Sequence, residues 1–192
     1  MRVILGVSGA SGAALSLAAA RHLRALGAMI DLVVSSAAER TLAAECGPEA
    51  FSDLAALCTH CHDLRDVGAS ISSGSTPVAG MLVAPCSMRS LAAIALGLDD
   101  NLLIRAAGVQ LKERRPLVLL AREAPLTLAH LRNMTAVTEM GGIVMPPVPA
   151  FYMRPLTTAD IVEQIAARAV DLLRLGPPVA RAWAGDTGMD AS

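Results

Sequence analysis

Aromatic and lysine side chains are both scarce in this chain of 192 residues, and each shortage excludes something. Aromatic residues make up 2% of the sequence whereas 54% of it is hydrophobic, so the core must consist of aliphatic side chains. The four aromatic residues, each a candidate for a specific role where it lies outside an apolar run, are Phe51, Phe151, Tyr152 and Trp183. Lys112 is the only lysine and the net charge is −1, which excludes the general attraction to polyanions on which non-specific nucleic-acid binding depends.

The N-terminus also lacks a long apolar segment. The first residues, MRVILGVSGASG, give only a short apolar run before a glycine turn, which is too short for a signal peptide or a membrane span. We therefore expect a soluble cytoplasmic protein with reduced thiols, no membrane span and no nucleic-acid partner.

Cysteine is rare as well, and two of the four cysteines fall in one short motif. Residues 58–62, CTHCH, match the CxxCH pattern of c-type haem attachment, but that attachment requires export of the chain. A metal site would need further ligands at finger-like spacing, and the sequence has no second cluster of that kind. We interpret residues 58–62 as a polar surface segment between elements, with a metal site as the alternative.

Short apolar runs alternate with helical patterns along the chain. Buried strands are predicted at 3–7, 29–34, 80–84, 117–121 and 143–145. Helices are predicted at 15–26, 37–45, 92–98, 102–111, 126–140 and 158–175. This alternation favours one α/β domain, residues 1–176, with a doubly wound parallel sheet of the flavodoxin-like or Rossmann-like kind. A Gly-Pro-Pro break precedes a C-terminal tail, residues 177–192.

The turn after the first strand, GVSGASGA, joins that strand to a helix, an arrangement that favours an anion at the helix N-terminus. Its glycines follow a GxxGxxG spacing, which differs from the GxGxxG of dinucleotide binders. The second strand ends in Ser35 and Ser36, where a dinucleotide fold carries an acid for the ribose. The pattern favours a mononucleotide over NAD.

Polar side chains follow several of the predicted strands. Ser11, Ser35, Ser87 and Arg122 each come just after one, and the carboxyl ends of parallel strands meet at one edge of a sheet. Taken singly, each of these residues is as well explained by a helix cap or an exposed turn. Together, hydroxyls, helix N-termini and an arginine at one edge predict a site for a phosphate-bearing cofactor.

Longer motifs carry a resemblance to a known family. They are GVSGASGA, SISSGS, APCSMRSLAAIALG, KERRPLVL followed by REAPL, and MPPVPAFY. The chain resembles the UbiX-like flavin prenyltransferases over nearly its whole length. The resemblance implies a flavodoxin-like fold that binds reduced FMN as prenyl acceptor and dimethylallyl phosphate as donor, without a metal. It also implies that the prenyl group is joined to flavin N5 and C6, that prenylated FMN serves a UbiD-type decarboxylase, and that the enzyme is a homo-oligomer, commonly a dodecamer.

The resemblance further implies roles for residues at matching positions. FMN contacts are expected from Gly9, Ala10, Ser11, Ser35, Ser87, Met88, Arg89, Ser90 and Arg122. Contacts to dimethylallyl phosphate are expected from Arg105, Lys112, Tyr152 and Arg168. Catalytic roles are expected for Ser11, Glu45, Lys112, Glu123 and Trp183, and the tail would pack near the active site.

The chemistry accounts for these residue types. Detaching an allyl group from phosphate separates charge, so lysine and arginine can stabilise the departing anion. An aromatic face can stabilise allyl-cation character, and a carboxylate beside the flavin can accept the proton that is lost.

Two alternatives stay open at this point. The first is a related FMN-dependent cysteine decarboxylase, although such enzymes typically carry a PxMNxxMW-like segment where this chain reads PPVPAFYMRP. The second is a non-catalytic FMN-binding subunit of a decarboxylase.

Lys112 and Arg122 flank the strand predicted at 117–121. Five or six extended residues span about 15–20 Å at roughly 3.3 Å per residue, so one phosphate cannot contact both ends. We therefore expect Lys112 to reach the site from a neighbouring subunit, which places the active site at a subunit interface.

Overall fold

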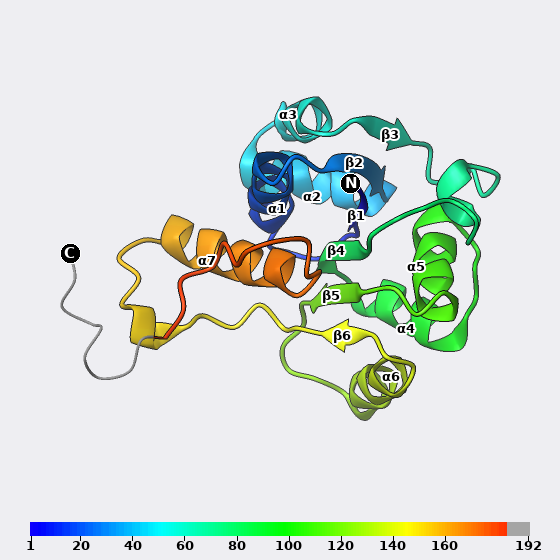
Figure 1. Ribbon diagram of the computed structural model, residues 1–192. Coiled ribbons are helices and arrows are strands. Elements are labelled where there is room, and N and C mark those ends of the chain that lie inside the picture. Colours follow the sequence, from blue (N-terminus) through cyan, green and yellow to red (C-terminus); the bar gives the residue numbers. More distant parts are fainter. Residues whose placement is uncertain (184–192) are drawn as a thin grey trace.

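A six-stranded parallel sheet forms the centre of the protein, seen in a computed structural model that describes residues 1–183 (Figure 1). Its strands are β1 (Arg2–Val7), β2 (Met29–Val34), β3 (His60–His62), β4 (Met81–Cys86), β5 (Leu117–Ala121) and β6 (Ile143–Val144). Their order in the sheet is β3-β2-β1-β4-β5-β6, which is the order of the doubly wound dinucleotide-binding fold. The winding reverses between β1 and β4, and folds of this kind bind ligands at the carboxyl ends of those strands.

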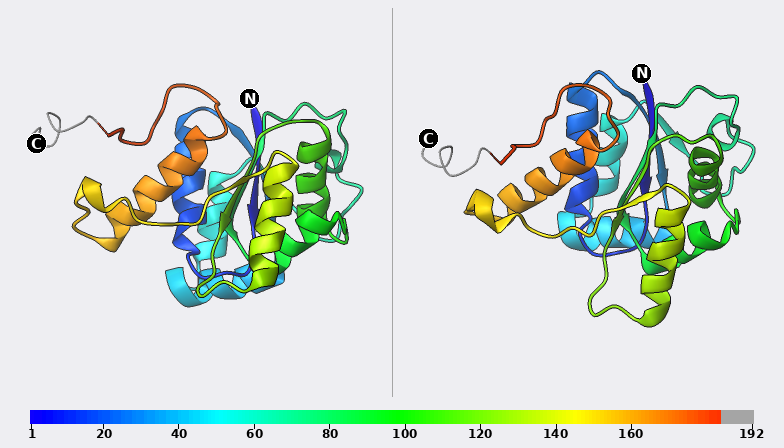
Figure 2. Two further views of the ribbon diagram at one scale, coloured as in Figure 1. Left: turned by 90° about the horizontal axis from the view of Figure 1, so that it is seen from below. Right: turned by 60° about the horizontal axis from the view of Figure 1, so that its bottom comes forward.

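Helices cover both faces of the sheet (Figures 1 and 2). One face packs against α1 (Ala14–Ala25), α2 (Ser36–Cys46), α3 (Ala50–Leu57) and α7 (Thr158–Asp171). The other packs against α4 (Met88–Leu96), α5 (Leu102–Lys112) and α6 (Leu128–Glu139). Two short 3₁₀ turns, η1 (Ser70–Ser72) and η2 (Phe151–Met153), lie in the connections. Within residues 1–183, no helix is long and apolar enough to cross a membrane.

The core is aliphatic, as the composition predicts. Val3, Leu5 and Val7 of β1 are buried on the α1 side of the sheet, and Ile4 is buried on the α5 side. Because both faces are covered, the strands read as continuous apolar runs, and this pattern predicted the bounds of β2 and β5 correctly.

The segment 58–62 corrects one expectation, because part of it is a strand. β3 pairs with β2 at the edge of the sheet, with His60 opposite Asp31 and His62 opposite Val33. The buried Asp31 carboxylate lies 2.7 Å from His62 Nε2 and accepts hydrogen bonds of 2.6 and 2.8 Å from Arg2. Burial alone would raise the pKa of Asp31, but hydrogen bonds from Arg2 and His62 and their charges lower it. Among the described residues, no group of Cys, His, Asp or Glu side chains is arranged to hold a metal ion.

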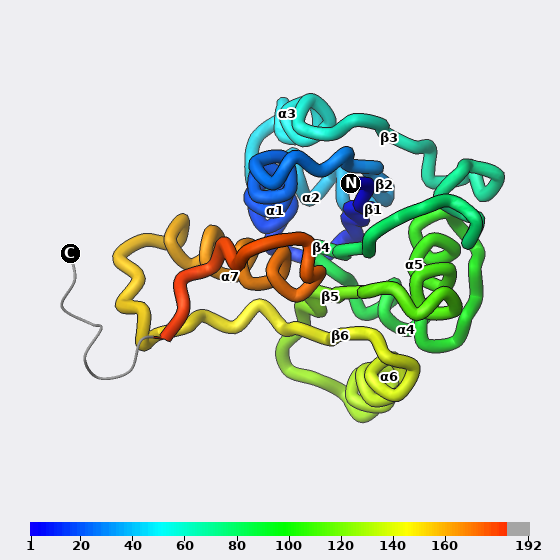
Figure 3. Tube along the Cα trace, viewed as in Figure 1, coloured from blue at the N-terminus to red at the C-terminus, as the bar shows by residue number. Residues whose placement is uncertain are grey.

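The chain after β6 extends away from the sheet and then returns. Residues 145–157 lead outward to the start of α7, which runs back and packs on α1 (Figure 3). The following segment, up to residue 183, then runs along α7 in the opposite direction (Figure 3). The helix predicted to reach residue 175 ends earlier, at Asp171, and Arg174 adopts a left-handed conformation with φ of 57°.

Candidate active site

Glu45, in the last turn of α2, lies against the N-terminus of α1. The backbone N–H groups of Gly12 and Ala13 each donate to Glu45 Oε2 at 2.8 Å. Burial would raise the pKa of Glu45, but hydrogen bonds from Ala13, the Ser11 hydroxyl and Gly12, with the charge of Arg122, lower it. Glu45 is therefore a carboxylate at neutral pH. The anion expected at this helix N-terminus is a side chain of the protein itself, which corrects the prediction of a ligand phosphate there.

Gly9 brings the turn after β1 into close contact with α2. A Cβ at Gly9 would collide with the Ala37 methyl group and lie 3.1 Å from the Ala37 carbonyl carbon. Ser35 caps the same helix, because its hydroxyl accepts a hydrogen bond of 3.2 Å from Ala38 N–H. A capping hydroxyl that accepts a backbone hydrogen bond can still donate its own proton, so the Ser35 hydroxyl remains a possible donor to a ligand.

Ser8 connects the turn after β1 to the turn after β4, at the point where the winding of the sheet reverses. Its hydroxyl donates to Pro85 O at 3.2 Å and accepts from Ser87 N–H at 2.8 Å. Ser87 caps α4 by accepting from Ser90 N–H, and donates its own proton to Ser90 Oγ at 3.2 Å. Ser8 was not among the predicted site residues, although its position directly after β1 matches that of Ser35 after β2.

Arg122 and Glu123 follow β5 at the same edge of the sheet. The Arg122 N–H donates to Cys86 O at 3.1 Å, which fixes the start of this turn beside the turn between β4 and α4. Both side chains are exposed, and Arg122 is close enough to Glu45 to lower its pKa. The carboxyl edge therefore holds a carboxylate and an arginine close together, with hydroxyls in the neighbouring turns. Of the other residues expected here, Met88 is buried and Arg89 is exposed in an ion pair with Asp100.

Arg105 and Lys112 form a second group, on α5. Arg105 Nη1 lies 2.8 Å from Asp99 Oδ2, and its Nε donates to Ser72 O at 3.2 Å. Lys112 is paired with Glu113 at the end of α5, directly before the amino end of β5. Lys112 thus lies at the opposite end of β5 from Arg122, as the sequence predicts.

Tyr152, Arg168 and Trp183 form a third group, which lines a cavity of about 410 Å³ between α7 and the segments on either side of it. The rings of Tyr152 and Trp183 meet edge to face, with centroids 5.3 Å apart and planes at 85°. The tail residues 178 and 180–183 line the same cavity. Residues 184–192 of the predicted tail lie outside the described residues.

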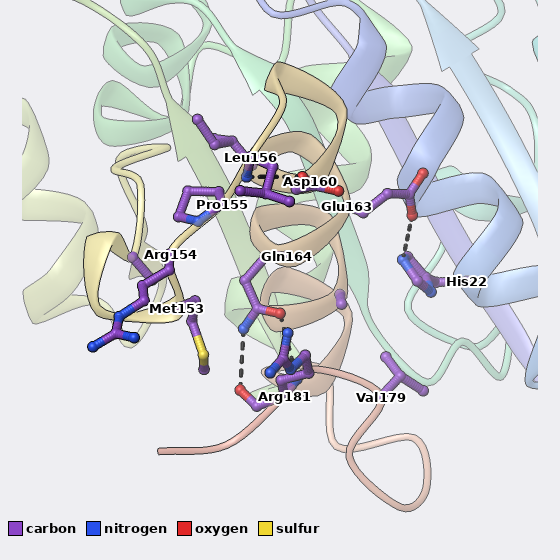
Figure 4. Close-up of a pocket in the computed structure, with 13 residues that line it drawn as sticks. His22, Met153, Arg154, Pro155, Leu156, Asp160, Glu163, Gln164, Val179 and Arg181 are labelled. Carbon is purple, nitrogen blue, oxygen red and sulfur yellow. Dashed lines mark hydrogen bonds and ion pairs between the residues drawn. The ribbon is translucent and has the colours of Figure 1, made fainter. Parts of the chain in front are cut away.

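A second cavity of about 410 Å³ adjoins this one and shares Ala150, Gln164 and Arg181 with it (Figure 4). His22 lies on its far side, with Nε2 3.0 Å from Glu163 Oε2. None of the residues that line this second cavity was expected in the site.

The three groups are the residues at the carboxyl edge of the sheet, the pair on α5 and the residues around Tyr152. They are separate within one subunit. Lys112 lies on α5 and Arg168 on α7, and these helices pack on opposite faces of the sheet. The lining of the cavity at Tyr152 includes none of the residues expected to contact FMN. One small ligand cannot touch all three groups in a single subunit.

Comparison with known proteins identifies the family. The Flavoprotein family model matches residues 1–170. The flavin prenyltransferase UbiX of Thauera aromatica is 49% identical over 186 residues, which cover 97% of this chain and 95% of that protein.

Solved structures agree. The crystal structure of AnUbiX (PadA1) in complex with FMN and dimethylallyl pyrophosphate gives a TM-score of 0.92 at 43% identity, covering 96% of this chain and 97% of that one. A dodecameric FMN-dependent UbiX-like decarboxylase from Escherichia coli O157:H7 gives 0.91 at 46% identity, covering 96% and 100%. The cysteine decarboxylase TvaF, covering 89% and 98% at 16% identity with a TM-score of 0.61, is similar in fold alone. The chain therefore belongs to the UbiX-like flavin prenyltransferases, within the flavoprotein family.

Proposed function

We propose that this protein transfers a dimethylallyl group from dimethylallyl phosphate to N5 and C6 of reduced FMN, and that a UbiD-type decarboxylase receives the prenylated flavin. The similarity to UbiX enzymes over nearly the whole chain supports this activity. The observation that carries it is the carboxyl edge of the sheet, where Glu45 is held as a carboxylate close to Ser11 and Arg122.

The residues at this edge fit FMN. Because Glu45 already accepts from the first amides of α1, a phosphate at that helix N-terminus would meet a negative charge. The N-terminus of α4 offers the alternative, with the Ser87 cap and the Arg122 turn beside it, while Ser35 follows β2 on the other side of β1. Gly9 lets the turn after β1 pack directly against Ala37 of α2, which fixes the position of this turn at the same edge.

When bound, reduced FMN supplies the nucleophilic N5 and C6 positions that accept the allyl group. Glu45 accepts the proton that leaves as the new ring forms, since its lowered pKa keeps it ionised and Ser11 orients it. Arg105, Lys112 and Arg168 bind the phosphate of the donor and stabilise the negative charge that it gains as the bond to the allyl group breaks. Tyr152 and Trp183 present aromatic surface to the allyl group as it acquires positive charge. Glu123, the residue after Arg122, acts where the phosphate of the donor substrate binds.

We propose further that the active site forms between subunits. In one subunit β5 separates Lys112 from Arg122, and the sheet separates α5 from α7. The segment before α7 also exposes large apolar side chains, with Val148 67%, Phe151 74% and Leu156 93% accessible. Surfaces of this kind are buried when copies assemble. A homo-oligomer of the dodecameric kind would bring the three groups together, with residues 178 and 180–183 lining the side of the site at Tyr152.

The test is anaerobic incubation of the purified protein with reduced FMN and dimethylallyl phosphate. We expect release of inorganic phosphate and a gain of one prenyl unit in flavin mass. In a separate incubation with oxidised FMN as the electron acceptor, release of carbon dioxide from a C-terminal cysteine peptide would identify a cysteine decarboxylase instead. FMN binding with neither reaction would identify an accessory subunit. Parallel assays with dimethylallyl diphosphate decide which donor the enzyme prefers.

A further inference from the structure

Gln164 and Asp171 stand on one face of α7 with Arg168 between them. The three residues are spaced i, i+4 and i+7, which places their side chains in one row along a helix. The segment that returns after α7 runs along this row (Figure 3). The row therefore faces both the returning segment and the cavity that holds Tyr152 and Trp183.

Asp171 holds the start of the returning segment. Its Oδ1 accepts from Val179 N–H at 2.7 Å and its Oδ2 accepts from Ala180 N–H at 3.2 Å. A carboxylate that receives two successive backbone N–H groups fixes the direction of the chain as well as its position.

Gln164 holds the same segment further along. Its Nε2 donates to Arg181 O at 3.1 Å, and its Oε1 accepts from Arg181 N–H at 3.4 Å (Figure 4). The amide thus pairs with both backbone groups of one residue, as a neighbouring strand would. The backbone of residues 179–181 thus makes four hydrogen bonds with these two side chains, three as donor and one as acceptor.

Trp183 lies two residues beyond the last of these contacts, a distance of about 7 Å along an extended chain. Trp183 as a whole is 51% exposed, and its ring meets that of Tyr152 edge to face. One half-exposed ring contact is weak beside the conformational entropy that is lost when an exposed segment is ordered. The position of the indole therefore depends on the fixed backbone just before it.

We propose that Gln164 and Asp171 are positioning residues for the prenyl transfer, because they hold residues 179–181 on α7 and thereby place Trp183 over Tyr152 beside Arg168. The inference rests on the proposed function, which assigns Tyr152, Arg168 and Trp183 to the donor substrate. It adds that the aromatic part of this subsite is set by polar side chains that act through the backbone of residues 179–181.

Trp183 is the only tryptophan in the chain, so its fluorescence reports this placement independently of activity. In the double variant Gln164→Ala/Asp171→Ala we expect red-shifted emission and stronger quenching by acrylamide. The single variant Gln164→Ala should show a smaller change in the same direction. The matched control is Glu163→Ala, which removes a neighbouring α7 carboxylate that contacts Arg21 and not the tail. It should leave the emission unchanged.

Kinetics provide the second measurement. In the double variant kcat should fall roughly 10-fold, because a well-placed cation–π contact stabilises a transition state by about that factor. The KM for dimethylallyl phosphate should change much less, because Arg168 stays on α7. In a Trp183→Leu background the same double substitution should cost nothing further, since it acts through the indole. Circular dichroism and FMN binding equal to those of the wild type verify that the variants are folded.

Unchanged emission and quenching in the double variant would overturn the proposal, as would losses of kcat that simply add to that of Trp183→Leu. A wild-type enzyme without prenyl transfer would refute the proposed function instead. The fluorescence comparison would still decide whether Gln164 and Asp171 hold the tail.

Discussion

Replacing Glu45 with glutamine separates the two tasks that the structure gives this side chain. The substitution keeps an oxygen that can accept from the N–H groups of Gly12 and Ala13, but it removes the negative charge at the N-terminus of α1. An exposed charge of this kind contributes about 0.5–1 kcal/mol to stability. For a chain of this size that is a decrease of about 1–4 °C in Tm. The fold should therefore survive.

The loss of activity should be far larger. A general base contributes about 10²- to 10⁴-fold to rate, and glutamine cannot accept the proton. We expect Glu45→Gln to lose prenyl transfer by a factor in that range while it still binds FMN. The assay is the gain of prenyl mass by reduced FMN under anaerobic conditions, with FMN binding measured on the same preparation.

The pH dependence gives an independent check. The pKa of Glu45 is lower in the folded protein than in the unfolded chain, so its stabilising effect is complete above the unfolded pKa and is lost as pH falls through the folded pKa. The Tm difference between wild type and Glu45→Gln should be constant between about pH 6 and 8 and should shrink progressively as the pH falls below about 4. Glu139→Gln, which changes an exposed carboxylate in the last turn of α6, is the control and should show neither effect. A fully active Glu45→Gln enzyme would refute the assignment of the base.

Three further predictions follow from the packing and the charges. Gly9→Ala should reduce FMN affinity at least about 10-fold because a Cβ there displaces the turn from α2, as equilibrium dialysis can measure. Asp31→Asn should cost about 3 kcal/mol in urea unfolding, because it breaks the buried pair with Arg2; as the folded pKa of Asp31 is lowered, the difference should shrink as the pH falls below about 4. Maleimide should label Cys61 first, since its side chain is exposed whereas Cys86 is buried and its pKa is raised to about 12; faster labelling of Cys86 would contradict this packing.

The elements that sequence patterns predicted well are those whose ends carry a local signal. β5 is bounded by Pro116 on one side and by the charged pair after Ala121 on the other, and its bounds were predicted correctly. A helix cap was one of the interpretations given for Ser87, and its hydroxyl accepts the backbone hydrogen bond of Ser90. These features depend on neighbouring residues alone.

The features that sequence patterns missed depend on contacts between distant segments. β3 has three residues, and its polar sequence gives no strand signal because it forms at the sheet edge through pairing with β2. Helix α3 was not predicted at all. Glu45 was placed at the end of a helix, but its contact with Gly12 spans 33 residues and appears only once α2 packs beside α1. The separation of Lys112 from Arg122 was predictable because a single strand divides them.

Mixed oligomers test most directly whether the active site is shared between subunits. Lys112→Ala and Arg122→Ala chains are each expected to be inactive alone. When they are co-expressed in equal amounts, about a quarter of the sites should combine an intact Lys112 from one chain with an intact Arg122 from its neighbour. We predict recovery of prenyl transfer to about that fraction of the wild-type rate. If the mixed oligomers are as inactive as either parent, the two residues act within one subunit and the shared site is wrong.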